Sequence, residues 1–176
     1  MPTVPLVLNG ELVEDLERMN KEYPGNLYVT PVVYGGAFAL AAFTDGKEML
    51  AEAQRMADSA EFRWHMEERA IGCLPEDAPA PQTLECWDLP NLRGEVLRTR
   101  PGKHRSDLSA IPRRGFLNWD NAIRSVDACA YPYSASSEKD FHGVTHFINF
   151  RCGFNPTAFG INTSSIVNWG TLPPDF

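Results

Sequence analysis

The feature that most constrains this chain is a pair of stretches of similar length in its second half, about residues 84–126 and 127–168. In the first stretch, six residues separate Trp87 from Gly94, and Ser125 stands near the end. Glycine at such a point is typical of a tight turn, because it takes backbone conformations that a Cβ atom disfavours. Short apolar runs alternate with turn residues throughout both stretches, which predicts an all-β sandwich.

This arrangement resembles the βγ-crystallin family. Each Greek-key motif of that family has an aromatic-x6-Gly turn early and a serine late. Trp87, Gly94 and Ser125 match those three positions. The resemblance implies that the aromatic ring packs over the turn and that the serine hydroxyl ties the turn to a neighbouring strand.

The second stretch matches this pattern in part. Gly143 and the pair Ser164-Ser165 stand where the pattern asks for glycine and serine. The aromatic residues before Gly143, Tyr131 and Tyr133, lie farther from it than six intervening residues. An insertion around residues 134–139 would explain that distance.

The first 75 residues have helical as well as strand periodicity. We expect a helix, two strands and then helices, in the order α-β-β-α. Pro31 predicts an edge strand, because proline cannot donate to a sheet ladder, and Asp45 predicts a helix N-cap. The expected elements are a helix over 9–20, strands over 27–33 and 37–43, a helix after Asp45, and a helical stretch over 61–71.

Prolines punctuate residues 76–81, which is a linker composition. We therefore predict an α+β protein with two units. Residues 1–75 form a small α+β domain, and residues 82–176 form a Greek-key β-sandwich of the βγ-crystallin type.

The net charge of −7 argues against a general nucleic-acid binder, which needs a basic surface. No apolar run is long enough to span a membrane. The first residues lack a basic n-region, so we expect a cytoplasmic protein, or a secreted one if a leader was removed. The four cysteines, Cys73, Cys86, Cys129 and Cys152, are either free thiols or two disulfides with three possible pairings.

Many microbial members of the family bind calcium through the pattern Asn/Asp-Asn/Asp-x-x-Ser/Thr-Ser, once per motif. The first copy here reads DNAIRS over residues 120–125, and the second reads GINTSS over 160–165. Arg124 stands where a hydroxyl ligand is expected, and a guanidinium repels Ca²⁺ and has no acceptor. We therefore predict a weak or lost calcium site, and no other cofactor. Its candidate ligands are Asp120, Asn121 and Ser164.

A basic stretch with one acid, Asp107, lies in the middle of the first motif. Clustered cations suit an acidic partner or a phosphate-rich ligand. The candidate binding residues are Arg98, Arg100, Arg105, Arg113 and Arg114, accompanied by Lys103 and His104.

The sequence has no nucleophile elbow, P-loop or dinucleotide fingerprint. An enzyme with its site in the groove between the two units stays a possibility, since domain junctions favour pockets. The reactive side chains to inspect for that role are His104, His142, Tyr133 and Cys86.

Three functions are therefore open. The first is a non-enzymatic binding or inhibitory module, because the bacterial relatives that the resemblance points to include small metalloproteinase inhibitors and killer-toxin-like proteins. Loops at one end of the sandwich would then contact a protein partner. The second is a small enzyme, and the third is a structural protein with a degenerate calcium site.

Overall fold

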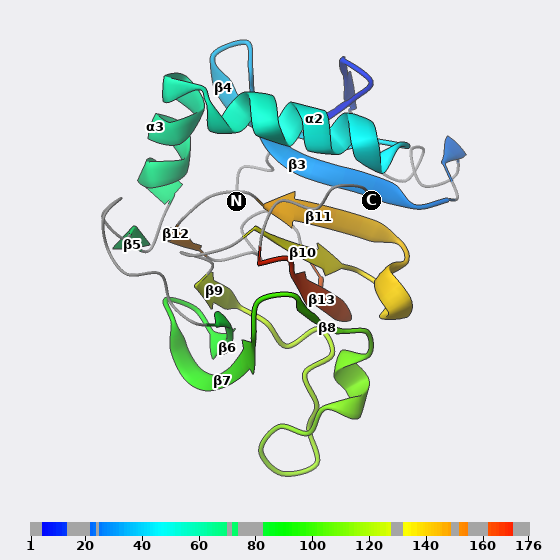
Figure 1. The fold of residues 1–176 in the computed structure, drawn as a ribbon, viewed down its shortest axis with the longest axis vertical. Helices are drawn as coiled ribbons and strands as arrows, with labels where there is room; N and C mark the ends of the chain where they lie inside the picture. Colours follow the sequence, from blue (N-terminus) through cyan, green and yellow to red (C-terminus); the bar gives the residue numbers. More distant parts are fainter. Residues whose placement is uncertain are drawn as a thin grey trace.

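The computed structural model describes residues 5–13, 22–23, 25–69, 72–73, 83–127, 132–148, 152–154 and 162–170. These residues form an eight-stranded sheet, a five-stranded sheet and two α-helices. Both helices lie at one end of the molecule, over the strands of the first 43 residues (Figure 1). The α+β class that the sequence predicts is confirmed.

The N-terminal elements begin with a β-hairpin of β1 (Leu6–Leu8) and β2 (Glu11–Val13). The helix predicted to start at Asn9 is therefore wrong in its first turn. Asn9 and Gly10 form the two-residue connection, both with positive φ (49° and 87°). Asn-Gly is the preferred pair for such a turn, and it outweighed the apolar spacing that suggested a helix. The rest of that expected helix, residues 14–20, lies outside the described residues.

The next elements confirm the predicted strand pair and the helices after it. Strand β3 (Leu27–Tyr34) pairs antiparallel with β4 (Ala37–Phe43) across a Gly35-Gly36 turn. Helix α2 (Gly46–Ala57) begins at Asp45, whose Oδ1 accepts a 2.7 Å hydrogen bond from the Lys47 amide. Helix α3 (Ala60–Arg69) follows. Within the described residues, neither helix has the length and apolar composition needed to cross a membrane.

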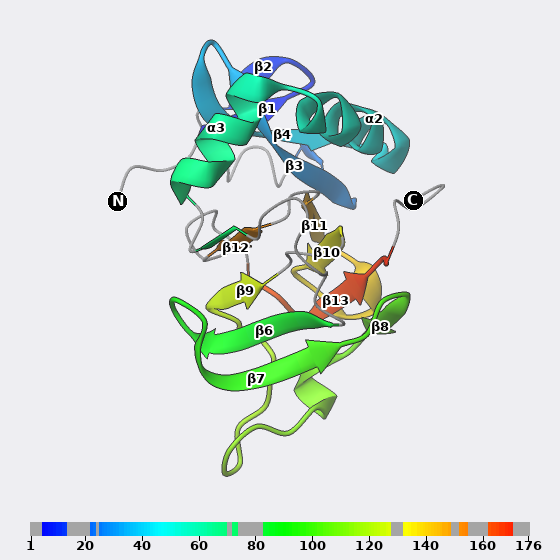
Figure 2. The same cartoon turned by 60° about the vertical axis from the view of Figure 1, so that its left-hand side comes forward.

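The second half folds as two interlocked Greek keys (Figure 2). Strands β6 and β7 form a hairpin, β9 lies beside β6, and β8 joins the other sheet. The second motif repeats this: β10 and β11 form a hairpin, β13 lies beside β10, and β12 crosses to pair with β9. The bounds are β6 (Leu84–Leu89), β7 (Arg93–Thr99), β8 (Lys103–Arg105), β9 (Ser125–Asp127), β10 (Tyr133–Ser136), β11 (Val144–Ile148), β12 (Cys152–Phe154) and β13 (Ser165–Asn168).

The two motifs have matching registers, and no insertion is needed to align them. Trp87 lies opposite Ser125 and Val96 in the first motif. Ser136 lies opposite Ser165 and Thr145 in the second. Ser136 therefore takes the aromatic position, with six residues between it and Gly143. The expected insertion around 134–139 is wrong, because the second motif replaced its aromatic residue with serine and kept its length.

The halves of the chain share one sheet. Strand β3 pairs in parallel with β11 over Leu27–Val29 and Val144–His146, and the Leu27 amide donates to Gly143 O at 3.1 Å. Strand β3 is therefore interior, and the prediction of an edge strand from Pro31 is wrong. The pairing of β3 with β11 ends at Val29. Pro31 therefore lies beyond the residues of β3 that pair with β11, and its missing backbone N–H costs no hydrogen bond to that strand.

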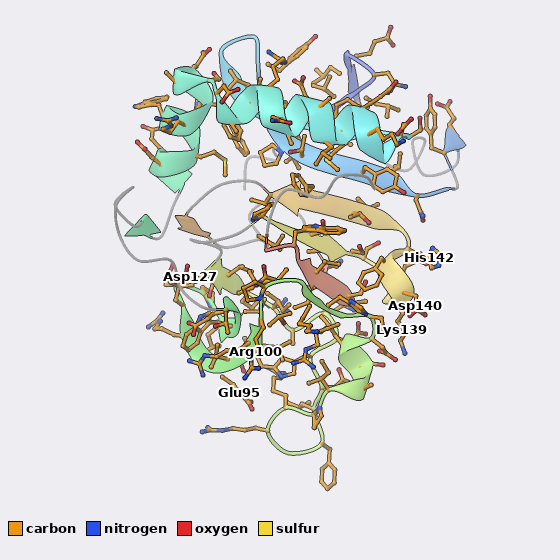
Figure 3. All side chains as sticks on the ribbon, in the orientation of Figure 1. Glu95, Arg100, Asp127, Lys139, Asp140 and His142 are labelled. Carbon is orange, nitrogen blue, oxygen red and sulfur yellow. The ribbon has the colours of Figure 1, made fainter. Side chains whose placement is uncertain are left out.

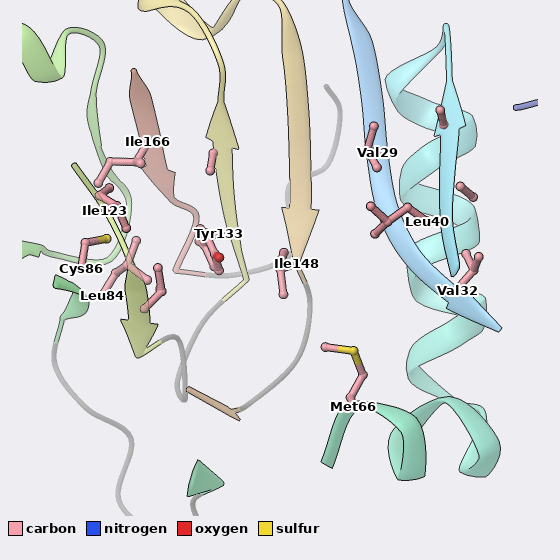
Figure 4. Close-up of a cluster of buried hydrophobic side chains, with 14 of the residues drawn as sticks. Val29, Val32, Leu40, Met66, Leu84, Cys86, Ile123, Tyr133, Ile148 and Ile166 are labelled. Carbon is pink, nitrogen blue, oxygen red and sulfur yellow. The ribbon is translucent and has the colours of Figure 1, made fainter. Parts of the chain in front are cut away.

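The core is continuous across this shared sheet. One buried cluster includes Val29, Leu40 and Met66 from the first half and Tyr133 and Ile148 from the second (Figure 4). A second cluster places Phe147 of β11 against Met49 and Ala53 of helix α2. The α2 helix thus covers the seam between β3 and β11. The predicted linker, residues 76–81, lies outside the described residues. Before it in the chain, β5 (Gly72–Cys73) pairs with β12.

Candidate functional site

The serines of the two motifs make the contacts that the family resemblance implies. Ser125 Oγ donates to Leu89 O at 2.6 Å and accepts from the Leu92 amide at 2.9 Å. Ser165 Oγ does the same with Glu138 O at 2.7 Å and the Phe141 amide at 3.2 Å. Each serine closes the turn that folds over its own hairpin. Of the pair Ser164-Ser165, it is Ser165 that plays this part.

Glycine is required in both folded turns. Gly94 has φ +90° and Gly143 has φ +77°, and a Cβ atom would collide with the Asp88 carboxylate at the first and with the Ser137 hydroxyl at the second. Those same side chains accept hydrogen bonds at equivalent places, Asp88 from the Glu95 amide and Ser137 from the Val144 amide. These contacts are structural, since they hold the folded turns of the two hairpins.

The structure brings the predicted calcium ligands close together. The Asn121 amide donates to Thr163 O at 2.9 Å, which places Asp120 and Asn121 next to Ser164. Arg124 Nη1 donates to Asn121 O at 2.9 Å and to Ile123 O at 3.3 Å. Its guanidinium thus occupies two backbone carbonyl oxygens, a kind of ligand that Ca²⁺ uses in proteins. Asp120 Oδ1 is buried without a hydrogen-bond partner among the described residues.

Five of the predicted basic residues surround one pocket of about 550 Å³. Its basic lining residues come from the end of β7, the turn after it and β8. Thr83 completes its lining. The basic residues are Arg98, Arg100, Lys103, His104 and Arg105. We call this the β7–β8 pocket.

Arg113 and Arg114 do not line the β7–β8 pocket. Arg113 Nη1 forms a 2.7 Å ion pair with Asp88 Oδ2, both side chains being only 17% exposed, and its guanidinium lies 5.9 Å from the Trp119 ring. The Arg114 amide donates to Glu95 Oε2 at 3.1 Å. Both residues instead brace the loop formed by residues 111–119.

This 111–119 loop was not singled out by sequence reasoning. Phe116 at its tip is fully exposed, and Leu117 is 59% exposed. The loop projects away from both sheets (Figure 1). The signal in the sequence is a Phe-Leu pair between Gly115 and Asn118, with no apolar periodicity around it to explain burial.

The base of the loop is closed by hydrogen bonds. The Arg113 amide donates to Leu117 O at 2.9 Å, and the Trp119 amide reaches both Leu108 O and Ile111 O at 3.2 Å. Trp119 itself is 2% exposed and belongs to the core cluster. The loop thus holds an exposed aromatic side chain on a fixed base.

The side chains considered for catalysis are dispersed. Cys86 and Tyr133 lie in the core, 0% and 1% exposed, where no substrate reaches. Burial, and then the charge of Glu85, raise the pKa of the Cys86 thiol to about 12. Burial also raises the pKa of Tyr133 well above its usual value, with Cys86 adding to the shift. The His104 ring packs edge-on against the Phe141 ring, with 5.5 Å between the ring centroids.

His142 lies at the junction of the two halves, as the enzyme alternative requires. It lines a pocket of about 480 Å³ together with Tyr23, Asn26 and Glu138. Figure 3 shows it on the turn between β10 and β11, beside Lys139 and Asp140. No other described candidate for catalysis lines that pocket. Within the described residues, no three His, Cys, Asp or Glu side chains are grouped to hold a metal ion.

Comparison with solved structures gives a weak likeness. No family model matches the chain, and no curated protein matches it. A solved structure described as "Evolution of the eye lens beta-gamma-crystallin domain fold" is 14% identical, with a TM-score of 0.42, over 55% of this chain and 93% of that one. The Greek-key assignment therefore depends on the strand order, registers and serine contacts described above.

Proposed function

We propose that this protein is a non-enzymatic binding module that contacts a protein partner through the 111–119 loop. The observation that carries the proposal is the full exposure of Phe116 at the tip of a loop with a fixed base. Aromatic anchors of this kind supply much of the free energy of protein–protein binding when a partner pocket desolvates them. A fixed base lowers the entropy lost on binding, because the loop is already ordered.

A proteinase is the partner class that we propose, and inhibition is the activity. The family resemblance points to bacterial metalloproteinase inhibitors. The loop offers Arg114-Gly115-Phe116-Leu117 as an exposed segment that an active-site cleft could receive. Cleavage of such a segment is slow when its two ends stay held, because the cleaved ends do not separate.

The enzyme alternative is supported less well. It retains His142 in the junction pocket, whereas Cys86 and Tyr133 are enclosed in the core. A reaction that depends on general acid–base catalysis needs its groups within hydrogen-bond reach of one another. Among the described candidates, only His142 lines that pocket.

The test is an inhibition assay with a panel of zinc metalloproteinases at micromolar protein. We expect a saturable decrease in the activity of at least one enzyme, weakened about tenfold or more by Phe116→Ala, since an aromatic anchor is worth over about 1.4 kcal/mol. The matched control is Trp64→Ala, which removes an exposed aromatic side chain (54%) from helix α3. No inhibition at micromolar protein, or equal weakening by both variants, would overturn the proposal.

A further inference from the structure

The β7–β8 pocket concentrates positive charge in an acidic protein. Its five basic side chains are all exposed, whereas the chain as a whole has a net charge of −7. Like charges held together repel one another, and such a cluster attracts anions to its surface. The cluster is therefore a candidate binding site for an anion.

The backbone under these side chains is fixed. The Lys103 amide donates to Arg100 O at 3.1 Å, which closes a turn with Pro101 and Gly102 at its centre. Gly102 has φ +68°, as a type II turn requires at this position. Strand β8 pairs with β13, and the buried Asn168 side chain donates to Thr99 O at 2.8 Å.

Within the described part of the chain, an ion pair compensates only one of these cations. Arg98 Nε forms a 2.7 Å ion pair with Glu85. Arg100, Lys103 and Arg105 have no ion pair with any residue that the structure describes. Three positive charges, together with the imidazole of His104, thus stay available around one cavity.

We infer that the β7–β8 pocket binds a small molecule carrying at least two phosphate groups. Guanidinium groups match phosphate oxygens in a bidentate fashion, and lysine adds a point charge. Three uncompensated cations exceed what one phosphate neutralises, and about 550 Å³ exceeds what one phosphate fills.

The lining also selects against a nucleic-acid strand. Proteins that bind single strands add aromatic platforms on which bases stack. Among the described residues, the pocket lining contains no Phe, Tyr or Trp, and His104 is already in edge-on contact with Phe141. The ligand is therefore recognised by its phosphates, whether these are free or attached to a small organic molecule.

Protection of sheet edges is the competing explanation. Strands β7 and β8 are the last strands of their sheets, and charged side chains keep such edges from pairing with other chains. That role requires no bound anion. The two explanations differ in whether a polyphosphate binds saturably.

The experiment is isothermal titration of the full chain with sodium tripolyphosphate, pyrophosphate and orthophosphate at one ionic strength. We expect saturable binding of tripolyphosphate at least about tenfold tighter than orthophosphate, because each added charged contact strengthens binding. A parallel arm with a nucleoside triphosphate distinguishes the sources. Affinity equal to that of tripolyphosphate means that phosphates alone are read, and higher affinity means that the organic part also contacts the pocket.

The variants are Arg100→Gln and Lys103→Gln, both exposed, with Arg63→Gln on helix α3 as a control that also removes one charge. We expect each pocket variant to weaken tripolyphosphate binding about fivefold or more, and the control to change it less than about twofold. Circular dichroism on each variant verifies folding. No saturable binding, or equal weakening by Arg63→Gln, would overturn the inference and leave edge protection. Neither result bears on the 111–119 loop.

Discussion

Replacing Ser125 with alanine tests the closure of the first folded turn. The Ser125 hydroxyl is 0% exposed, and it makes both a 2.6 Å bond to Leu89 O and a 2.9 Å bond from the Leu92 amide. Alanine removes both bonds. It also deprives Asn91 and Leu92 of the contact that holds them at positive φ, 61° and 54°.

The expected cost follows from these two bonds. A typical hydrogen bond contributes about 1 kcal/mol net, and a buried partner left unpaired costs about 1–3 kcal/mol. We therefore expect Ser125→Ala to lower the free energy of unfolding by about 2–4 kcal/mol. Ser165→Ala removes the equivalent pair, with a longer bond from Phe141 (3.2 Å), and we expect a cost at the lower end of that range.

The assay is urea unfolding followed by tryptophan fluorescence, with comparison of slopes to verify that the unfolded surface is unchanged. Ser109→Ala is the control, since it removes a 2.6 Å hydroxyl bond to Asp107 on a half-exposed turn and should cost about 0.5 kcal/mol or less. Hydrogen exchange at the Leu92 amide should accelerate in Ser125→Ala only. A cost below about 0.5 kcal/mol, or unchanged exchange at Leu92, would refute the reasoning.

Three other predictions concern single side chains. Burial lowers the pKa of His146 from 6.5 to about 4, so the unfolded chain binds a proton at a higher pH than the folded chain does. The free energy of unfolding should therefore fall by about 3 kcal/mol as the pH drops from 6.5 to 4. Urea unfolding at several pH values should show that His146→Gln loses this pH dependence. Calorimetry should find Ca²⁺ binding weaker than micromolar in the native chain and tighter in Arg124→Ser, which frees Asn121 O; tight binding by the native chain would contradict this. Cys86 should stay unreactive toward a thiol reagent until the chain is unfolded, and a mass showing two disulfides would contradict its burial as a free thiol.

Local patterns in the sequence were sufficient for parts of the fold and not for others. Trp87, Gly94 and Ser125 belong to one motif whose contacts are made by the hairpin and the strand beside it, so their spacing predicted the turn. Asp45 caps its helix through its own neighbour, Lys47. The hairpin at Asn9 is equally local, but its Asn-Gly turn is followed by apolar residues at helical spacing, and that spacing favoured a helix.

The seam between β3 and β11 could not be predicted in this way. It joins Leu27 to Val144 in parallel, and parallel pairing of distant strands leaves no turn signal between them. The β7–β8 pocket was predicted only in part. The sequence places all the candidate basic residues in one stretch, over residues 98–114. The turn at Pro101-Gly102 gathers those of residues 98–105 around a cavity, whereas the ion pair with Asp88 holds Arg113 at the base of the 111–119 loop.

The sheet order explains why both proposed sites lie away from the helices. In the eight-stranded sheet, β3 covers the edge that β11 would otherwise expose, and α2 covers the seam. Strands β7 and β8 end their sheets at the opposite end of the molecule, and the 111–119 loop projects beyond them (Figure 1). A partner can therefore approach the pocket and the loop without disturbing the paired strands. This separation predicts that substitutions at Phe116 or Arg100 change binding while the free energy of unfolding stays nearly constant, and that substitutions at Ser125 do the reverse.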